Sequence, residues 1–333
     1  MKALILEEKC SPFVVREVAD PLVGPDDVLI KLKASALNHR DYYIQQGTYP
    51  RVTYPVIIGS DGAGVVEDVG INVSRSLINT DVVINASQSW GDNPDVQSRD
   101  FKVLGFPDSG TFAEYIAVPA KYIQPKPNHL SFEEAAAISL AGLTAYRSLF
   151  TRGELQSNQS VLITGIGGGV AVAAMQLALA VGANVYVTSG ADEKINRARS
   201  MGARAGGNYK SPSWAEDLQQ ASGGFHLIVD GAAGAGFGKL LDIALPGAKI
   251  VIYGSTQGRI QNAEPARIFW KQLSILGATM GTESEFEAML RFAGQNDVRP
   301  VVDRVFSITE ADAGLERMLK GEQFGKIVFK NDF

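Results

Sequence analysis

The chain contains very little cysteine and histidine, which limits the metal chemistry that it could support. Among 333 residues there are one cysteine, Cys10, and three histidines, His39, His129 and His226, which lie far apart. A catalytic zinc ion usually takes three His, Cys or carboxylate ligands, and a structural zinc ion takes four, mostly cysteines. Neither set occurs here with a paired spacing, so we predict no metal site. A single cysteine also excludes an intrachain disulfide and favours a reducing compartment, the cytoplasm.

The chain also lacks a strong charge excess and a membrane-spanning pattern. Its formal net charge is −5, and 45% of its residues are hydrophobic and 20% charged, which is typical of globular domains. Without a basic excess, a nucleic-acid partner has little electrostatic support. The N-terminal stretch MKALILEEK has too short an apolar run for a signal peptide. The most apolar segment, residues 161–187, has glycines near its start, which favours a strand, a turn and a helix over a membrane span.

Two sequence patterns follow one another along the chain. Residues 1 to about 122 contain short β-type runs that proline and glycine interrupt, as in an irregular β-barrel-like domain. From Ser131 a helix is expected, opened by a capping box of Ser131 and Glu134. After it, short apolar strands alternate with helices, which predicts a doubly wound parallel sheet. The expected strands are SVLITG, NVYVTSG, HLIVDGA, KIVIYGS and LSILGAT, and the expected helices are GVAVAAMQLALAVG and DEKINRARSMG.

We therefore predict an α/β protein with two domains. A β-rich domain covers residues 1–128, a Rossmann domain covers 129–282, and residues 283–333 return to the first domain with two helices and two strands. The stretch VIIGSDGAGVVEDVG, residues 56–70, suggests a strand, a glycine turn and a second strand. The long polar stretch of residues 85–110 is expected to be a surface loop.

The motif with the clearest chemistry is VLITGIGGGVAVAAMQLA, where an apolar strand runs into a glycine-rich turn and then a helix. Glycines let a pyrophosphate approach the backbone closely, and the helix N-terminus offers unpaired N–H groups and a positive dipole end. A tight turn alone would also use glycine, but the strand–helix–strand setting favours dinucleotide binding. The residues expected to contact the cofactor here are Gly165, Gly167, Gly168, Gly169 and Val170.

The end of the second strand separates NAD from NADP. An NAD site usually has an acid at that strand end, which bonds to the ribose 2′-hydroxyl. Here the strand ends in VTSG, with Ser189 and no carboxylate, and Lys194 and Arg197 follow. A 2′-phosphate would favour these basic groups, so we predict NADPH. A solvated pair of Glu193 and Arg197 on the helix face is compatible with this interpretation.

With these motifs in order, the chain resembles the medium-chain dehydrogenase/reductase superfamily along nearly its whole length, and most closely its zinc-free quinone oxidoreductase branch. The stretches that carry the resemblance are IIGSDGAGVVEDVG, GTFAEYIAVPA, AAAISLAGLTAY, VLITGIGGGVA, MGARAGGNY and FGKIVF. The resemblance implies a GroES-like catalytic domain beside the Rossmann domain. It also implies a homodimer, for which LSILGATMGT could supply an edge strand.

The resemblance also bears on the metal. In the zinc branch a cysteine stands at the position of Asn38, a histidine at that of Ser60 and a glutamate at that of Asp61. These replacements imply a site without zinc, in which Asp61 is structural and pairs with a nearby cation.

Relatives in the quinone oxidoreductase branch line their substrate cleft at the positions of Asn38, Asp41, Tyr43 and Tyr49, within NHRDYYIQQGTYP. Without a Lewis acid, hydride delivery to an isolated ketone lacks a strong electrophile. Quinones, enones and enoyl thioesters need less help because the negative charge is delocalised, so a tyrosine hydroxyl or an asparagine amide can suffice. Tyr49 could also donate a proton.

Purely structural roles remain open for these residues. The tyrosines could be packing groups, Asn38 could cap a turn, and Arg40 could pair with an acid on the surface.

The resemblance adds further expected cofactor contacts. Lys194 and Tyr209 correspond to the 2′-phosphate contacts of close relatives, and Tyr253 and Gly254 follow the strand whose end would meet the nicotinamide ribose. The remaining expected contacts are Thr144, Ser189, Phe324 and Lys326.

Together these features predict an NADPH-dependent, zinc-independent oxidoreductase that transfers hydride to quinones or activated C=C acceptors. One alternative is an enoyl thioester reductase with Tyr49 as the proton donor. An alternative from another class is an NADPH-binding regulatory protein without turnover.

Overall fold

The computed structural model describes residues 1–333, which form two compact units. Unit 1 contains residues 1–141 and 281–333, and unit 2 contains residues 142–280. The chain passes from unit 1 to unit 2 within helix α2, Phe132–Tyr146. The predicted capping box opens this helix, since the Ser131 and Glu134 side chains each accept the other's backbone N–H. None of the helices is both long and apolar enough to cross a bilayer.

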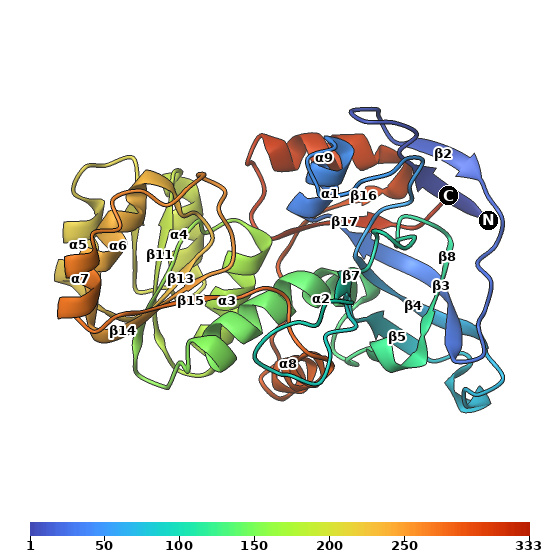
Figure 1. Ribbon diagram of the computed structural model, residues 1–333, viewed down its shortest axis with the longest axis horizontal. Coiled ribbons are helices and arrows are strands. Elements are labelled where there is room, and N and C mark those ends of the chain that lie inside the picture. The colour runs from blue at the N-terminus through green and yellow to red at the C-terminus, as the bar shows by residue number, and fades with distance from the viewer. The chain divides into compact units, whose positions relative to one another are not determined.

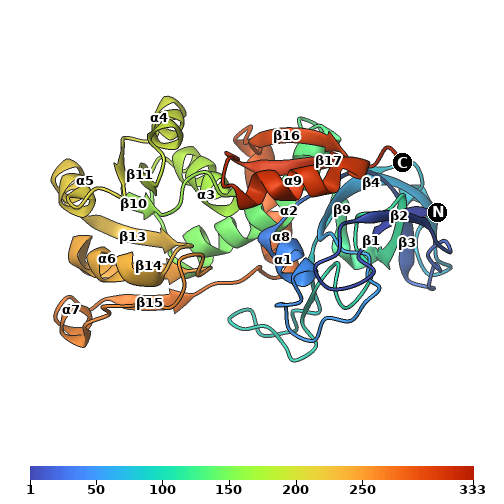
Figure 2. The ribbon, with the colours of Figure 1, turned by 90° about the horizontal axis from the view of Figure 1, so that it is seen from above.

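Unit 2 is built on a six-stranded sheet with the order β12-β11-β10-β13-β14-β15. Every neighbouring pair is parallel, which confirms the predicted doubly wound sheet. Figure 2 shows β11, β10, β13, β14 and β15 side by side, with α7 next to β15. The strands are β10 Ser160–Ile163, β11 Asn184–Ser189, β12 Ala205–Asn208, β13 Phe225–Asp230, β14 Ala244–Ile252 and β15 Ser274–Gly277.

Five helices connect the strands of unit 2. They are α3 Gly169–Ala180, α4 Asp192–Ser200, α5 Trp214–Ser222, α6 Phe237–Ile243 and α7 Pro265–Trp270. The sequence predicted α3 and α4, but it did not predict α5, α6, α7 or strand β12. Strand β12 consists of the residues AGGN, which lack the β-branched and aromatic side chains that usually indicate a strand.

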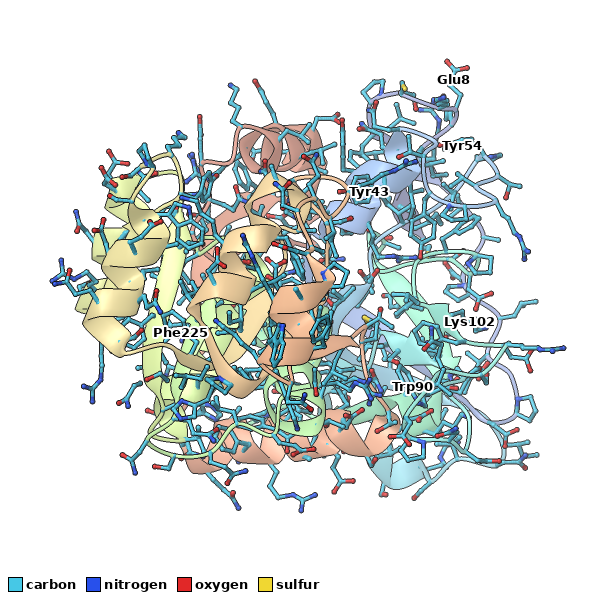
Figure 3. All side chains as sticks on the ribbon, turned by 60° about the vertical axis from the view of Figure 1, so that its left-hand side comes forward. Glu8, Tyr43, Tyr54, Trp90, Lys102 and Phe225 are labelled. Carbon is cyan, nitrogen blue, oxygen red and sulfur yellow. The ribbon has the colours of Figure 1, made fainter.

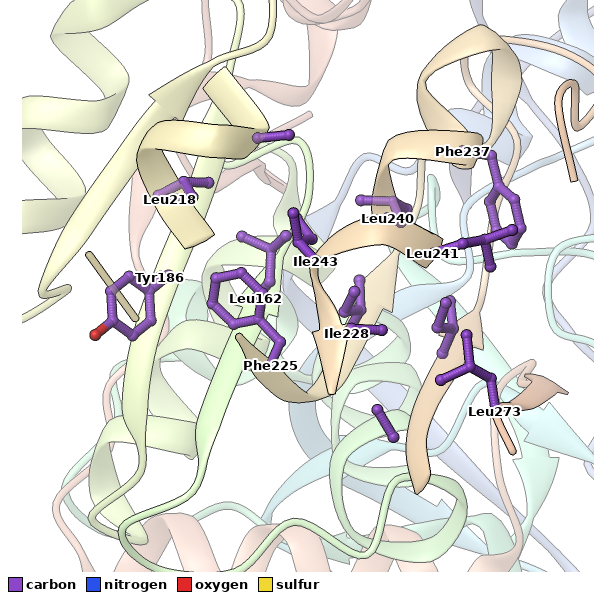
Figure 4. Packing of buried hydrophobic residues seen from close by; sticks show 14 of the residues in the cluster. Leu162, Tyr186, Leu218, Phe225, Ile228, Phe237, Leu240, Leu241, Ile243 and Leu273 are labelled. Carbon is purple, nitrogen blue, oxygen red and sulfur yellow. The ribbon is translucent and has the colours of Figure 1, made fainter. Parts of the chain in front are cut away.

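The core of unit 2 covers the central strands on both faces, as parallel sheets require. Leu162, Ile228 and Ile250 lie on adjacent strands and are completely buried. Figure 4 shows Leu162 and Ile228 with side chains of α5 and α6, among them Leu218 and Leu240. Phe225 meets Tyr186 edge to face, with ring centroids 5.3 Å apart, a geometry that aromatic pairs favour.

Unit 1 contains a seven-stranded sheet with the order β16-β17-β3-β4-β5-β9, in which β8 also pairs with β3. Strand β17 is antiparallel to β3, so the C-terminal segment pairs with the sheet of unit 1. Helix α9 packs on β16 and β17 (Figure 1). The strands are β3 Asp27–Ala36, β4 Asp61–Val69, β5 Asp81–Ile84, β8 Tyr115–Pro119, β9 Ile123–Pro125, β16 Val302–Ser307 and β17 Lys326–Lys330. The helices are α1 His39–Gln45, α8 Glu283–Gln295 and α9 Ala311–Leu319.

Two local predictions for unit 1 were wrong. Residues 85–110 are not only a surface loop, because β6 (Ser87–Gln88) pairs with β7 (Lys102–Val103). In addition, Trp90 is buried and packs edge to face on Phe101. Residues 56–70 form one strand rather than two. Before β4 only Val56 is bridged to another strand, because Gly59 adopts a φ of 101° that breaks the extended run. A second small sheet pairs β1 (Lys2–Ile5) with β2 (Val14–Glu17).

Candidate cofactor and acceptor sites

Most of the residues predicted to bind the cofactor lie at the end of the unit 2 sheet where its strands have their carboxyl ends. They follow the carboxyl ends of parallel strands, the place where open α/β sheets bind ligands. The glycine loop follows β10, Ser189 ends β11, Tyr209 follows β12, and Tyr253 and Gly254 follow β14. Thr144 is buried on helix α2, where its hydroxyl contacts the Met280 sulfur at 3.9 Å. Phe324 and Lys326 belong to unit 1.

The glycine loop has the geometry that a pyrophosphate needs. Gly165 and Gly167 have φ values of 68° and 118°, which favour glycine, and the space beside Gly165 is open. Gly168 is the N-cap of the twelve-residue helix α3 and has no side chain with which to cap it. The N–H groups of the first helical turn therefore lack a side-chain acceptor and can hold an anion.

Two basic side chains and a tyrosine gather around the end of β11. A Cβ atom built on Gly167 would lie 3.0 Å from the Lys194 ammonium, so this lysine crosses the glycine loop. A Cβ on Gly190 would lie 2.5 Å from the Tyr209 hydroxyl and 3.1 Å from Lys210. The residues thus fit an NAD(P) dinucleotide. The acid nearest along the chain, Asp192, accepts a hydrogen bond from Asn208.

A cavity of about 250 Å³ in unit 2 opens beside the glycine loop. Thr164, Gly165 and Thr188 line one part of it, and Asp230 lines another. Asp230 is completely buried and accepts bonds from the Thr164 hydroxyl at 2.6 Å and from the backbone N–H of Ala232 and Ala233. This buried acid fixes the ends of β10 and β13 next to the cavity, and the sequence analysis did not recognise it.

In unit 1, a buried network surrounds Asn38 at the start of helix α1. Its side-chain Nδ2 donates to Asp61 Oδ2 at 2.9 Å, and its Oδ1 accepts from the Lys326 ammonium at 2.6 Å. Asp61 also receives the Lys326 ammonium at 2.9 Å and the backbone N–H of Leu140 at 2.8 Å. The prediction that Asp61 pairs with a nearby cation is confirmed. Both ends of the Asn38 amide are engaged inside the protein, so Asn38 acts here as part of the framework.

Arg40 forms a second cationic centre next to this network. Its guanidinium donates to the Ser60 hydroxyl at 2.5 Å and to the Leu104 carbonyl at 2.6 Å, and more weakly to two further carbonyls of residues 103–106. The interpretation of Arg40 as a surface ion pair was wrong, because its partners are neutral oxygen atoms of the same unit. Arg40 therefore connects α1 to Ser60, just before β4, and to residues 103–106.

Tyr49 lies on this guanidinium. Its ring centroid is 5.0 Å from the Arg40 Cζ atom, and it packs edge to face on Phe106. The Tyr43 carbonyl accepts the backbone N–H of Tyr49 at 3.0 Å and so fixes the turn after α1. Tyr43 is 41% exposed, and its ring lies against Tyr42. Figure 3 labels Tyr43 on the blue helix α1. Arg40 and Tyr43 thus position Tyr49, whose hydroxyl makes no hydrogen bond within the protein.

Asp41 caps the helix from inside. Its Oδ2 accepts the Asn38 backbone N–H at 2.8 Å, whereas its buried Oδ1 has no partner. Burial raises the pKa of Asp41 to about 6, although the positive charges of Arg40 and Lys326 and the bond from Asn38 oppose the rise. An unpartnered buried oxygen explains why the ionised form is disfavoured.

Replacing Asp41 with asparagine is expected to change how stability depends on pH. The folded protein binds this proton more tightly than the unfolded chain, so the stability from protonated Asp41 is complete below pH 4 and is lost as the pH rises through about 6. The shift corresponds to about 3 kcal/mol. The midpoint temperature of thermal unfolding should therefore fall less between pH 5 and pH 8 in D41N than in the wild type. An identical pH dependence in both proteins would exclude Asp41 as the titrating group.

These residues do not fit the zinc ion that the zinc branch implies. No group of three or more His, Cys, Asp or Glu side chains is arranged to hold a metal ion. At the three positions that would supply ligands, Asn38 and Asp61 accept hydrogen bonds from the Lys326 ammonium, and Ser60 accepts one from the Arg40 guanidinium.

A GroES-like unit together with a dinucleotide-binding unit defines the class of NAD(P)-dependent dehydrogenases and reductases. Residues 24–128 match the family "Alcohol dehydrogenase GroES-like domain", and residues 169–295 match "Zinc-binding dehydrogenase". The chain belongs to the medium-chain dehydrogenase/reductase superfamily, which confirms the fold class and the oxidoreductase class predicted from the sequence.

Relatives over nearly the whole chain carry different names. The chain is 33% identical to the "Zinc-type alcohol dehydrogenase-like protein YogA" of Leptosphaeria maculans, across 96% of this chain and 94% of that protein. It is 29% identical to human "Quinone oxidoreductase", across 96% and 94%. A crystal structure titled "NAD-dependent alcohol dehydrogenase" superimposes with a TM-score of 0.93 at 34% identity, covering 99% of each chain. The predicted quinone oxidoreductase branch is thus among the relatives, at lower identity than a zinc-type protein.

Proposed function

We propose that the protein is an NADPH-dependent, zinc-independent reductase of conjugated acceptors, namely quinones or enones. The observation that carries this proposal is the occupation of the three zinc-branch positions by hydrogen bonds to Lys326 and Arg40. A site without a free ligand set polarises an acceptor only through its own hydrogen-bond donors and charges. Such a site suits acceptors that delocalise the charge produced by hydride transfer.

The cofactor half of the proposal rests on unit 2. Bound NADPH would supply a hydride from its nicotinamide ring. The glycine loop and the first turn of α3 would hold its pyrophosphate, and Ser189, Lys194 and Tyr209 would receive the 2′-phosphate. The residues after β14, Tyr253 and Gly254, would meet the nicotinamide ribose.

The acceptor half rests on Tyr49. Its hydroxyl has no partner within the protein, and its ring is fixed by Arg40 and Phe106. We assign to it the hydrogen bond to the acceptor oxygen, where negative charge develops when the new C–H bond forms at the conjugated carbon. The same hydroxyl is suited to return a proton to the resulting enolate.

A panel of acceptors tests the proposal. NADPH oxidation should be followed with quinones, enones, enoyl thioesters and saturated ketones, using protein dialysed against a chelator. The proposal expects turnover with quinones or enones and little with saturated ketones. NADPH binding without oxidation of any acceptor would favour a regulatory NADPH-binding protein instead.

A second enzymatic candidate is an enoyl thioester reductase. It is favoured by 27% identity to "Acryloyl-coenzyme A reductase" of Sulfurisphaera tokodaii, across 99% of this chain and 100% of that protein. In the same panel, a higher kcat/KM for crotonyl-CoA than for the quinones and enones would select this candidate.

We further propose that two copies of the chain pair through strand β15. This strand is at one edge of the unit 2 sheet, and its Ile275 is 37% exposed. Phe269 and Trp270, on the preceding helix, are 56% and 80% exposed. An exposed apolar edge strand is a template for pairing, and a twofold axis would let the same edge serve both copies.

Substituting Ile275 with aspartate should convert the dimer to a monomer, because the charge would be placed in the paired edge. Light scattering after size-exclusion chromatography measures the mass. Leu22→Asp is the matched control, since Leu22 is 92% exposed in unit 1. A monomeric wild type, or a dimeric I275D protein, would contradict the proposed interface.

A further inference from the structure

The Lys326 ammonium sits in a cage of three oxygen atoms. It donates to Asn38 Oδ1 at 2.6 Å, to the Leu37 carbonyl at 2.8 Å and to Asp61 Oδ2 at 2.9 Å. The Lys326 side chain is 6% exposed and that of Asp61 is not exposed at all. Since an ammonium has three N–H bonds, all of its donors are engaged. Lys326 therefore has no hydrogen bond left for a substrate, and any effect on the reaction must act through its charge and its partners.

The cage brings together three distant parts of unit 1. Asn38 begins α1, Asp61 begins β4, and Lys326 begins β17, which lies 265 residues beyond Asp61. Ser60 adjoins Asp61 and accepts from Arg40, on which the Tyr49 ring lies. The caged ammonium is thus connected through Asp61, Ser60 and Arg40 to Tyr49, the side chain that we place at the acceptor oxygen.

The charges of the cage determine whether it stabilises or destabilises the negative charge that hydride transfer produces on the acceptor. Lys326 and Asp61 together are neutral. Without the lysine, a buried carboxylate would remain unpaired in the network that leads to Tyr49, and the low interior dielectric would strengthen its repulsion of the developing oxyanion. Without the carboxylate, an unopposed positive charge would remain, which favours the same oxyanion.

We propose that Lys326 takes the electrostatic place of the metal ion that these residues do not fit, as a positioning residue for hydride transfer. Its fixed charge neutralises Asp61 and holds Asn38, so that Asp61 presents no unpaired negative charge towards the acceptor. The inference rests on the proposed reductase function. It assigns to Lys326 a role on the acceptor side, distinct from the cofactor contact expected from the sequence.

The test is a set of charge variants measured with NADPH and an enone. Lys326→Met should lower kcat about 100-fold, because one electrostatic contact in an active site typically has this effect. The double variant Asp61→Asn/Lys326→Met is neutral again and should recover at least about 10-fold of that loss. Asp61→Asn alone should keep kcat within about 3-fold of the wild type. The charge-preserving Lys326→Arg should keep kcat within about 10-fold of the wild type.

Controls separate this role from folding and from cofactor binding. Lys330→Met, which removes an exposed lysine from the same strand, should leave kcat unchanged. Circular dichroism checks the fold of each variant. If K326M alone unfolds, the double variant still tests the inference, because it leaves no buried charge unpaired. NADPH affinity, measured by fluorescence titration, should stay within about 3-fold in K326M and in the double variant.

Three results would overturn the inference. Equal losses of kcat in D61N and K326M would indicate a merely structural pair. Weaker NADPH binding with an unchanged kcat would make Lys326 a cofactor contact. Chelator-sensitive activity of the wild type that zinc restores would return the role to a metal ion; acceptor reduction would stand, but its proposed independence of zinc would not. If the wild type reduces no acceptor at all, the proposed function fails first, and this inference with it.

Discussion

Replacing Tyr49 with phenylalanine is expected to lower kcat by about 100- to 1,000-fold, with a much smaller change in KM. Loss of one donor to a developing oxyanion typically costs this much, because the bond strengthens in the transition state. The phenylalanine ring keeps the contacts with Arg40 and Phe106, so the substitution removes only the hydroxyl. Steady-state kinetics with NADPH and the best acceptor of the panel measure the effect.

The neighbouring Tyr42 provides the matched control. It lies on α1, the helix that precedes Tyr49, and packs against the core of unit 1. Y42F should keep kcat within about 3-fold of the wild type, since its hydroxyl is not assigned to the reaction. If Y49F is as active as Y42F, Tyr49 is a packing residue, and the acceptor oxygen must be held by other groups.

Replacing Lys194 with glutamine is expected to raise the dissociation constant for NADPH about 10- to 100-fold and to leave that for NADH unchanged. The ammonium of Lys194 lies against the glycine loop, where it can reach a 2′-phosphate. A charge-assisted hydrogen bond of this kind contributes about 1.5–3 kcal/mol. Fluorescence titration with both cofactors measures the change without any need for turnover.

Arg199→Gln, on the exposed face of the same helix, is the control for a general loss of positive charge. It should change neither dissociation constant by more than about 2-fold, because exposed charges are screened by salt. Tighter binding of NADH than of NADPH by the wild type would contradict the assignment of NADPH. Equal losses for both cofactors in K194Q would place Lys194 at the pyrophosphate instead.

The sequence was informative wherever local patterns determine the structure. Glycines with positive φ marked the phosphate loop, Ser131 and Glu134 marked the start of α2, and apolar runs marked five of the six strands in unit 2. Strand β12 escaped prediction because its glycines have no side-chain signal, and its place is set by parallel pairing with β11. Its extended form therefore depends on tertiary contacts rather than on propensity.

The acceptor site was only partly predictable, for a physical reason. The side chains near Asn38 could be selected by resemblance, but the partner of Asp61 lies 265 residues away and depends on the pairing of β17 with β3. Arg40 was visible in the motif, yet its neutral partners come from a segment with no regular pattern. Charge compensation through such long-range contacts is a property of the folded chain, and one sequence alone does not specify it.

The central claim is that this chain reduces conjugated acceptors with NADPH and without a catalytic metal ion. The most direct measurement combines both parts in one sample: metal analysis of chelator-dialysed protein, followed by NADPH oxidation with a quinone or an enone in the same preparation. The account predicts less than one zinc ion in about ten chains, and a kcat that is the same before and after dialysis against the chelator. Stoichiometric zinc that survives dialysis, or activity that disappears with the metal and returns when zinc is added, would contradict it.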